Sequence, residues 1–252
     1  MTAAGQKAPR RPAYGGRFHR IANKVIDGSG PRVLLTPNHP ALREGRTMFP
    51  TTVVHPHESP RLLVSGVNQR KVGKVVSKGR WKGFPVYTLT LEERATCPSS
   101  CREWSTCYGN NMHHSRRHAA GLALEARLIE EVVTLSERHP CGFAVRLHVL
   151  GDFYSAAYVD LWAMLLREVP QVHVFGFTAY DPDSTLGAAI DTIIGDWPDR
   201  FCIRFSGRDS LVIASHADSR HVVCPVQTGK TDCCGTCGLC WTMRQPVEFV
   251  RH

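Results

Sequence analysis

The sequence predicts an α/β fold whose core is a partial (β/α) barrel or an open parallel sheet. Between residues 116 and 224, short apolar runs typical of strands alternate with amphipathic runs typical of helices. Strands that alternate with helices at this spacing form parallel sheets with right-handed crossovers. Two groups of cysteines flank this alternation. We therefore expect a β-rich N-terminal lead-in, a β/α core and a cysteine-rich C-terminal metal-binding segment.

The overall composition is that of a globular protein in a reducing compartment. The chain has 252 residues, of which 42% are hydrophobic, so it can bury a core without disulfide staples. It has no apolar run of about 18 residues, so we expect no membrane span. Residues 1–20 lack the apolar stretch of a signal peptide, which predicts a cytoplasmic protein. There, ten clustered cysteines indicate metal ligands rather than disulfides.

The net charge of +9 comes from 31 Lys and Arg against 22 Asp and Glu. Most of the excess lies in the first 82 residues. Such a surface attracts phosphate groups, so a nucleotide or a nucleic acid is the first candidate for a partner or substrate. The alternative is a solvated basic surface that only aids solubility.

The first third of the chain divides into a flexible basic arm at residues 1–30 and the lead-in at residues 31–95. Six prolines between residues 31 and 60 exclude long helices there. Short apolar or β-branched runs predict strands at residues 32–35, 51–55, 62–67, 71–77 and 84–91. The last of these predicted strands directly precedes the first cysteine group.

The β/α core spans residues 96–223 and begins with the cysteine loop. Apolar residues at helical spacing predict a helix over 116–138, which Pro140 ends. Ser155 and Ser184 are suited to cap helices over 156–168 and 185–196. We expect strands at 143–150, 172–178, 201–206 and 221–224, and a short helix or turn at 210–218.

Two of these strands carry basic side chains on one face. Within 143–150, Arg146 and His148 alternate with apolar residues, and Arg204 does so within 201–206. Central parallel strands are usually apolar on both faces, and a buried cation is costly unless it is paired or functional. We therefore take Arg146, His148 and Arg204 as candidate catalytic residues on a concave face. Pairing with core carboxylates, or a solvated edge, is the alternative.

The first cysteine group is a loop with Cys97, Cys101 and Cys107. A structural zinc ion usually takes four protein ligands. An iron–sulfur cubane held by three cysteines instead leaves one iron open to a small molecule. The three thiols therefore favour an open iron–sulfur cluster, with a zinc site completed by another residue, or simply buried thiols, as alternatives.

The second group lies in the C-terminal segment, residues 224–252. Cys224 is followed by Cys234, Cys237 and Cys240 at repeated C-x-x-C spacing, a strong metal signal. Four thiolates suit an iron–sulfur cluster or zinc. Cys233 is adjacent, and the sequence leaves open whether Cys233 or Cys234 is the ligand.

A further candidate site is the turn Gly151-Asp152 between a predicted strand and a predicted helix. Ligands of parallel α/β proteins bind at the carboxyl ends of the strands. Gly151 permits close approach of the backbone, and Asp152 offers a carboxylate for an amine. We expect Thr178 and Ser206, at the ends of other strands, to line the same pocket. In the alternative interpretation, Asp152 belongs to the helix cap.

The order of cysteine loop, helix, strand, Gly-acid turn, helix and strand resembles radical S-adenosylmethionine (SAM) enzymes. This resemblance implies a [4Fe-4S] cluster on Cys97, Cys101 and Cys107. It further implies SAM bound to the open iron and to the Gly151-Asp152 turn, with Tyr108 packing over the cluster or the adenine. Such enzymes cleave SAM reductively and need an electron donor.

Two features depart from that pattern. Five residues precede Cys107 where the usual loop has two, and the turn reads Gly-Asp-Phe rather than Gly-Gly-Glu-Pro. The Thr-Cys-Pro opening, the Cys-Tyr-Gly ending and the upstream Lys-Val-Gly-Lys also resemble a phage-encoded family called gene product 88, a name that implies no reaction.

Two other functions remain open at this point. In the first, both cysteine groups bind zinc, and the protein is a nucleic-acid-binding or scaffold module without catalysis. An iron–sulfur protein that uses its open iron on another small ligand, or that only transfers electrons, is the third possibility. Colourless protein with about two zinc ions per chain would favour the zinc module, and brown protein would favour clusters.

Overall fold

The computed structural model describes residues 33–213 and 215–250, and a five-stranded sheet lies at its centre. In spatial order its strands are β2 (Val64–Ser65), β3 (Val86–Thr88), β5 (Phe143–Leu147), β6 (Val172–Thr178) and β7 (Phe201–Phe205). β2 is antiparallel to β3, and the other pairs are parallel. The predicted α/β fold with a parallel sheet is therefore confirmed.

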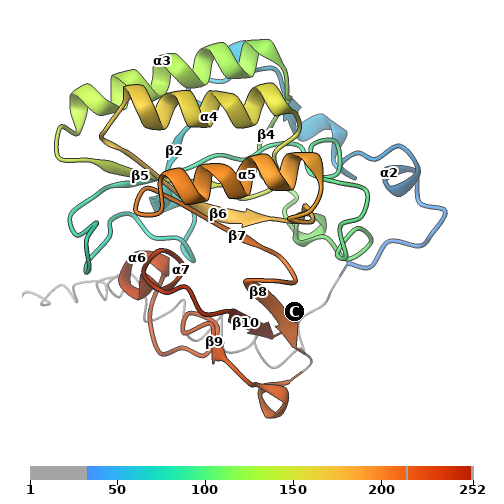
Figure 1. Cartoon of the computed structure of the whole chain (residues 1–252). Coiled ribbons are helices and arrows are strands. Elements are labelled where there is room, and N and C mark those ends of the chain that lie inside the picture. Colours follow the sequence, from blue (N-terminus) through green and yellow to red (C-terminus); the bar gives the residue numbers. More distant parts are fainter. Residues whose placement is uncertain (1–32, 214, 251–252) are drawn as a thin grey trace, which may run out of the picture.

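Three helices connect the parallel strands, and all of them lie on one face of the sheet (Figure 1). They are α3 (Leu122–Arg138), α4 (Ala156–Glu168) and α5 (Thr185–Asp196). β3, β5, β6 and β7 are neighbours in the same order in space as in sequence. A β/α barrel is wound in this way. Here the described strands form an open sheet, without the β7–β2 pairing that would close a barrel.

The helices pack on the sheet through the faces that the sequence pattern indicates. Phe143, Val145 and Leu147 of β5 lie in one core cluster with residues of α3, α4 and α5. Local caps set the helix starts, because Ser155 Oγ accepts a hydrogen bond from Tyr158 N and Ser184 Oγ accepts one from Gly187 N. α4, β6 and α5 have the predicted bounds.

Helix α3 begins later than predicted. Residues 117 and 118 form strand β4 (Arg117–His118), which pairs in parallel with β1 (Val53–Val54). Both residues of β4 are buried. The predicted helix start at residue 116 is wrong because tertiary pairing with a strand about 60 residues upstream overrides the local helical pattern.

The lead-in contains less strand than predicted. Besides β1, β2 and β3 it has short helical turns: α2 (Pro40–Arg43), η1 (Pro50–Thr52), η2 (Pro56–Glu58) and η3 (Gly66–Asn68). Residues 33–35 and 71–77 form no strand, apart from an isolated bridge between Val75 and Pro85. Prolines begin α2, η1 and η2 and interrupt pairing. The predicted arm at residues 1–30 lies outside the described residues.

The C-terminal part covers the face of the sheet opposite the three helices (Figure 1). It contains a parallel sheet of order β8 (Ser210–Ile213), β10 (Val247–Val250) and β9 (Val222–Val223). η5 (His216–Asp218), α6 (Cys234–Cys237) and α7 (Leu239–Thr242) complete it. The predicted helix or turn at residues 210–218 is wrong for residues 210–213, which pair with β10 as a strand, while η5 lies within the rest of that range. The predicted strand at 221–224 belongs to this small sheet and not to the core.

No helix in the described part of the chain has the length and apolar character needed to cross a membrane. The lead-in is continuous with the core, because β2 and β3 belong to the central sheet.

Candidate functional site

The cysteine loop after β3 and the carboxyl ends of β5, β6 and β7 enclose one cavity of about 300 Å³. It contains residues that the sequence predicts as metal, cofactor and catalytic positions. These are Cys97, Cys101, Cys107, Tyr108, His148, Gly151, Asp152, Thr178 and Ser206. The structure thus brings together residues that lie more than 100 positions apart in the chain.

Buried polar side chains hold the cysteine loop in place. Arg94 lies 3% exposed with φ 65°, a conformation that non-glycine residues rarely adopt. Its guanidinium donates to Trp104 O at 2.9 Å and to Asn110 Oδ1 at 2.6 Å. Glu93 and Arg117, both fully buried, form an ion pair beside it, with Nε 2.5 Å from Oε2. These contacts fix the loop that carries the thiols.

Sequence reasoning did not single out this polar support. Glu92, Glu93 and Arg94 directly precede the loop and are all buried. Three consecutive charged residues between a predicted strand and a cysteine loop were a usable signal, because buried charges require partners.

The three thiols lie close enough to influence one another. Burial is the main cause that raises the pKa of Cys97, and the charges of Asp152, Cys101 and Cys107 raise it further. Burial likewise raises the pKa of Cys101, and that of Cys107 to about 11. The metal-free thiols are therefore protonated at neutral pH, and a metal would have to displace these protons.

The Asp152 carboxylate accepts hydrogen bonds from the backbone that follows β5 and from the backbone that follows β6. Oδ1 accepts a hydrogen bond from Phe153 N at 2.8 Å, and Oδ2 accepts one from Ala179 N at 2.7 Å. Burial raises the pKa of Asp152 to about 7, and these bonds act in the opposite direction. Ser155, not Asp152, caps α4, so the alternative of a helix cap for Asp152 does not describe its contacts.

Gly151 meets the base of the cysteine loop closely. Its φ is +84°, and a Cβ there would lie 2.5 Å from Thr96 Oγ1 and 2.6 Å from Leu91 Cβ. The close approach that glycine permits is therefore toward the chain itself. It sets the depth at which the turn after β5 packs against the loop.

The three predicted catalytic residues lie in different surroundings. His148 lines the cavity, and its Nε2 lies 3.0 Å from the hydroxyl oxygen of Tyr158. Burial lowers the pKa of His148 to about 3, so the ring is neutral at neutral pH. The Arg146 guanidinium stacks on Phe177 and Phe175, at 4.6 and 5.7 Å from the ring centres. Its charge acts on Cys234, Cys240 and Tyr108.

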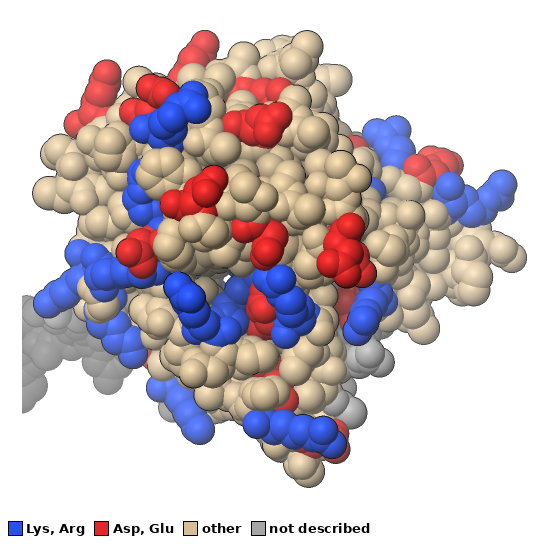
Figure 2. Space-filling view, in the orientation of Figure 1, with Lys and Arg blue, Asp and Glu red and all other residues tan. Residues whose placement is uncertain are grey.

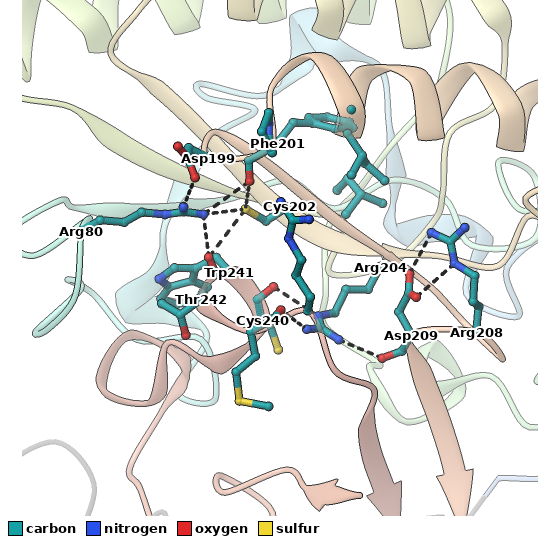
Figure 3. Close-up of a pocket in the computed structure, with 16 residues that line it drawn as sticks. Arg80, Asp199, Phe201, Cys202, Arg204, Arg208, Asp209, Cys240, Trp241 and Thr242 are labelled. Atoms are coloured by element: carbon teal, nitrogen blue, oxygen red, sulfur yellow. Dashed lines mark hydrogen bonds and ion pairs between the residues drawn. The ribbon is translucent and has the colours of Figure 1, made fainter.

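Arg204 lines a second cavity of about 450 Å³, between β7 and the C-terminal part (Figure 3). Its guanidinium donates to four backbone carbonyl oxygens, those of Cys240, Asp209, Gln245 and Met243. Arg204 thus ties the C-terminal segment to the sheet and does not line the cysteine cavity.

Basic side chains gather below α5, between the helical layer and the C-terminal part, and acidic side chains lie mainly over the helical layer (Figure 2). Several of the arginines in this region form ion pairs. Arg80 pairs with Asp199, and Arg208 pairs with Asp209 (Figure 3). Arg208 also pairs with Asp191. These pairs neutralise part of the positive charge on this face, and a nucleic-acid partner stays a prediction.

The second cysteine group is separate from the cavity and lies in the C-terminal part, on Cys224, Cys234, Cys237 and Cys240. All ten cysteines of the chain are free. Within residues 33–213 and 215–250, no group of three or more His, Cys, Asp and Glu side chains is arranged to hold a metal ion as it stands. Metal binding at either group therefore stays a prediction.

A comparison with protein families matches residues 62–236 to the family described as gene product 88. The chain belongs to the gene product 88 family. The part shared with the gene product 88 family contains the cysteine loop and the central sheet, and it ends before Cys237 and Cys240. No curated protein and no solved structure matches this member of the family.

Proposed function

We propose that the cysteine cavity holds an iron–sulfur cluster on Cys97, Cys101 and Cys107, and that the space beside its open iron binds SAM. The protein would then be a radical-SAM-like enzyme. The observation that supports this proposal is the convergence of the three thiols with Asp152, Thr178 and other strand-end residues in one cavity.

The winding of the sheet also supports the proposal. The cysteine loop follows the first parallel strand, β3, and the Gly151-Asp152 turn follows the next one, β5. The resemblance to radical SAM enzymes implies a partial barrel, in which sequential parallel strands likewise have their helices on one face. Loops at the carboxyl ends of such strands form the active sites of β/α barrels.

The unusual spacing before Cys107 is compatible with this arrangement. Trp104 lies within the longer spacer, where its Nε1 donates to Leu42 O and its carbonyl oxygen accepts from Arg94. The added residues are thereby held against the lead-in, and Cys107 still lines the cavity. Three thiols without a fourth protein ligand are the donor set of a cluster with an open iron.

Each residue has a defined part in the proposal. The three cysteines would hold the cluster, which when bound supplies one electron and an open coordination position. Both Asp152 oxygens accept one backbone N–H each and retain lone pairs for the ammonium group of SAM. Thr178 and Ser206 would contact the rest of the ligand, Tyr108 would cover it, and the neutral His148 would contact substrate. An electron-donor partner is required, and a nucleotide or nucleic acid is the proposed substrate class.

Anaerobic reconstitution with iron and sulfide tests the proposal in two steps. Cys101→Ser should abolish the spectrum of the three-cysteine cluster, and Cys141→Ser should not, because Cys141 is exposed and precedes β5 at the opposite end of the strand. Adding SAM to the reduced wild type should change the electron paramagnetic resonance spectrum. Asp152→Asn should keep the cluster and weaken the SAM effect.

The outcomes separate the alternatives. A cluster whose electron paramagnetic resonance spectrum does not change when SAM is added would contradict SAM binding. The protein would then only transfer electrons or bind another small ligand at the open iron. Colourless protein whose zinc content falls in Cys101→Ser would instead support the zinc-binding nucleic-acid or scaffold module.

A further inference from the structure

The four C-terminal cysteines come together from three consecutive elements. Cys224 follows β9, Cys234 and Cys237 lie three residues apart on α6, and Cys240 lies on α7. Gly238, at φ 74°, reverses the chain between the two short helices. Cys224 and Cys237 pack in one apolar cluster, and Cys234 and Cys240 pack against the adjacent cluster on the sheet. Four thiols thus lie in one largely buried region.

Mutual influence of the thiols agrees with this packing. Burial and the neighbouring Cys240 and Cys224 raise the pKa of Cys234. Burial, and then Cys224, raise the pKa of Cys240 to about 11. Cys224 acts in the same direction on Cys237. The charge of Cys224 therefore acts on all three other thiols.

Cys233 contacts Thr236 and the segment around Gly73. Its sulfur lies 3.6 Å from Thr236 Oγ1, within the cap of α6. A Cβ added to Gly73 would lie 2.5 Å from the same sulfur, so Cys233 packs against the segment at residues 71–77. Backbone bonds from Cys234 N to Lys71 O and from Gly235 N to Val72 O hold α6 on that segment. This contact selects Cys234 as the member of the thiol group.

Four basic side chains act on the thiols through their charge, and one of them, the exposed Lys78, acts on Cys237. Arg146 and Lys71 act on Cys234, and Arg204 and Arg146 act on Cys240. In the described part of the chain, Arg146, Arg204 and Lys71 form no ion pair with a carboxylate. Arg146 is largely buried, and its guanidinium lies against two aromatic rings. A guanidinium does not lose its proton in proteins, so it needs a counter-charge. Thiolates bound to a metal would provide one.

We infer that Cys224, Cys234, Cys237 and Cys240 form a closed metal centre of four thiolates, whose negative charge Arg146, Arg204 and Lys71 balance. Zinc and a [4Fe-4S] cluster both take four thiolates and both leave two net negative charges. On binding, each thiol gives its proton to solvent and forms one sulfur–metal bond. The centre fastens α6 and α7 onto the face of the sheet opposite the three helices.

Metal analysis of the full chain, purified without oxygen and reconstituted separately with zinc or with iron and sulfide, tests this inference. Cys237→Ser and Cys234→Ser should each lose one zinc ion, or about four irons, per chain. Cys233→Ser is the matched control and should retain the wild-type content. Cys101→Ser should keep the metal that Cys237→Ser loses. The test of the four-thiol site is therefore independent of the three-cysteine cluster.

A measurement on the wild type does not depend on how well a variant folds. Cysteine alkylation is followed by mass spectrometry while a chelator removes the metal. Cys224, Cys234, Cys237 and Cys240 should become reactive together, at the rate of metal loss, and the exposed Cys141 should react throughout. Equal metal content in wild type, Cys237→Ser and Cys233→Ser, or wild-type protein that takes up no metal beyond that lost in Cys101→Ser, would overturn the inference. So would alkylation of the four thiols at unrelated rates.

Discussion

The guanidinium of Arg146 lies 4.6 Å from the ring centre of Phe177, on the sheet face that carries the C-terminal cysteines. Stacking places the cation but does not neutralise it. The same charge acts on Cys234 and Cys240 of one thiol group and on Tyr108 beside the other. Arg146 is thus a positioning residue between the two candidate metal sites.

Replacing this cation should weaken metal binding at the four-thiol site. We expect Arg146→Met, which keeps the length of the side chain, to lower metal affinity about tenfold or more, in the range of other groups around metal ligands. Competition with a chelating dye measures the effect. Arg138→Met, at the exposed end of α3, should leave the affinity unchanged. Equal affinities of the two variants would contradict a role for the buried charge.

The buried ion pair of Glu93 and Arg117 should be a main determinant of stability. Glu93→Gln leaves the Arg117 guanidinium, 0% exposed, without its counter-charge, and should cost about 3–5 kcal/mol of unfolding free energy. Asp191→Asn breaks the exposed pair with Arg208 and should cost no more than about 1 kcal/mol. Urea denaturation of both variants measures the difference. Similar losses would show that the buried network does not support the cysteine loop as described.

The contact between Gly73 and Cys233 predicts a specific double-mutant result. Gly73→Ala adds a Cβ 2.5 Å from the Cys233 sulfur at φ +90°, so both overlap and backbone strain destabilise it. Gly83→Ala, at φ +91° with no atom within 4 Å, should show only the strain, about 1–2 kcal/mol. In a Cys233→Ala background, the cost of Gly73→Ala should fall toward that of Gly83→Ala. A cost independent of residue 233 would disprove the contact.

His118 should make stability depend on pH in mildly acidic solution. Burial, and then the nearby Arg116 and Arg127, lower its pKa from 6.5 to about 4. Between these values the unfolded chain binds the proton and the folded chain does not, so stability is full above pH 6.5 and falls as the pH drops toward 4. His118→Gln should flatten this part of the stability curve, and the exposed His57→Gln should not. Identical slopes in both variants would contradict the assignment.

Local patterns in the sequence were sufficient for the core elements. Ser155 and Ser184 cap α4 and α5 at the predicted positions, and β6 has its predicted bounds. Apolar periodicity and capping depend on neighbours within a few residues, so the sequence contains them directly. The side chains of β5 also alternate as predicted, with Val145 facing the helices and Arg146 facing the C-terminal part.

Contacts between distant residues were beyond such patterns. Strand β4 exists because Arg117 pairs with Val53, and β8 exists because it pairs with β10. Arg204 reads as a catalytic candidate in the strand pattern, yet its donors are taken by carbonyls of the C-terminal segment. A strand's partner and a guanidinium's acceptors are set by the whole chain.

By itself, the sequence determined the two cysteine groups, the α/β alternation and the Gly151-Asp152 turn, because residue type and spacing are local properties. Only the tertiary structure decided that Ser206, more than 100 residues from Cys97, lines the same cavity, and that the Cys233 sulfur lies beside Thr236 and Gly73. The reason is physical. A buried core forms only when segments distant in the sequence pack against one another, and one sulfur atom can contact only one of these segments.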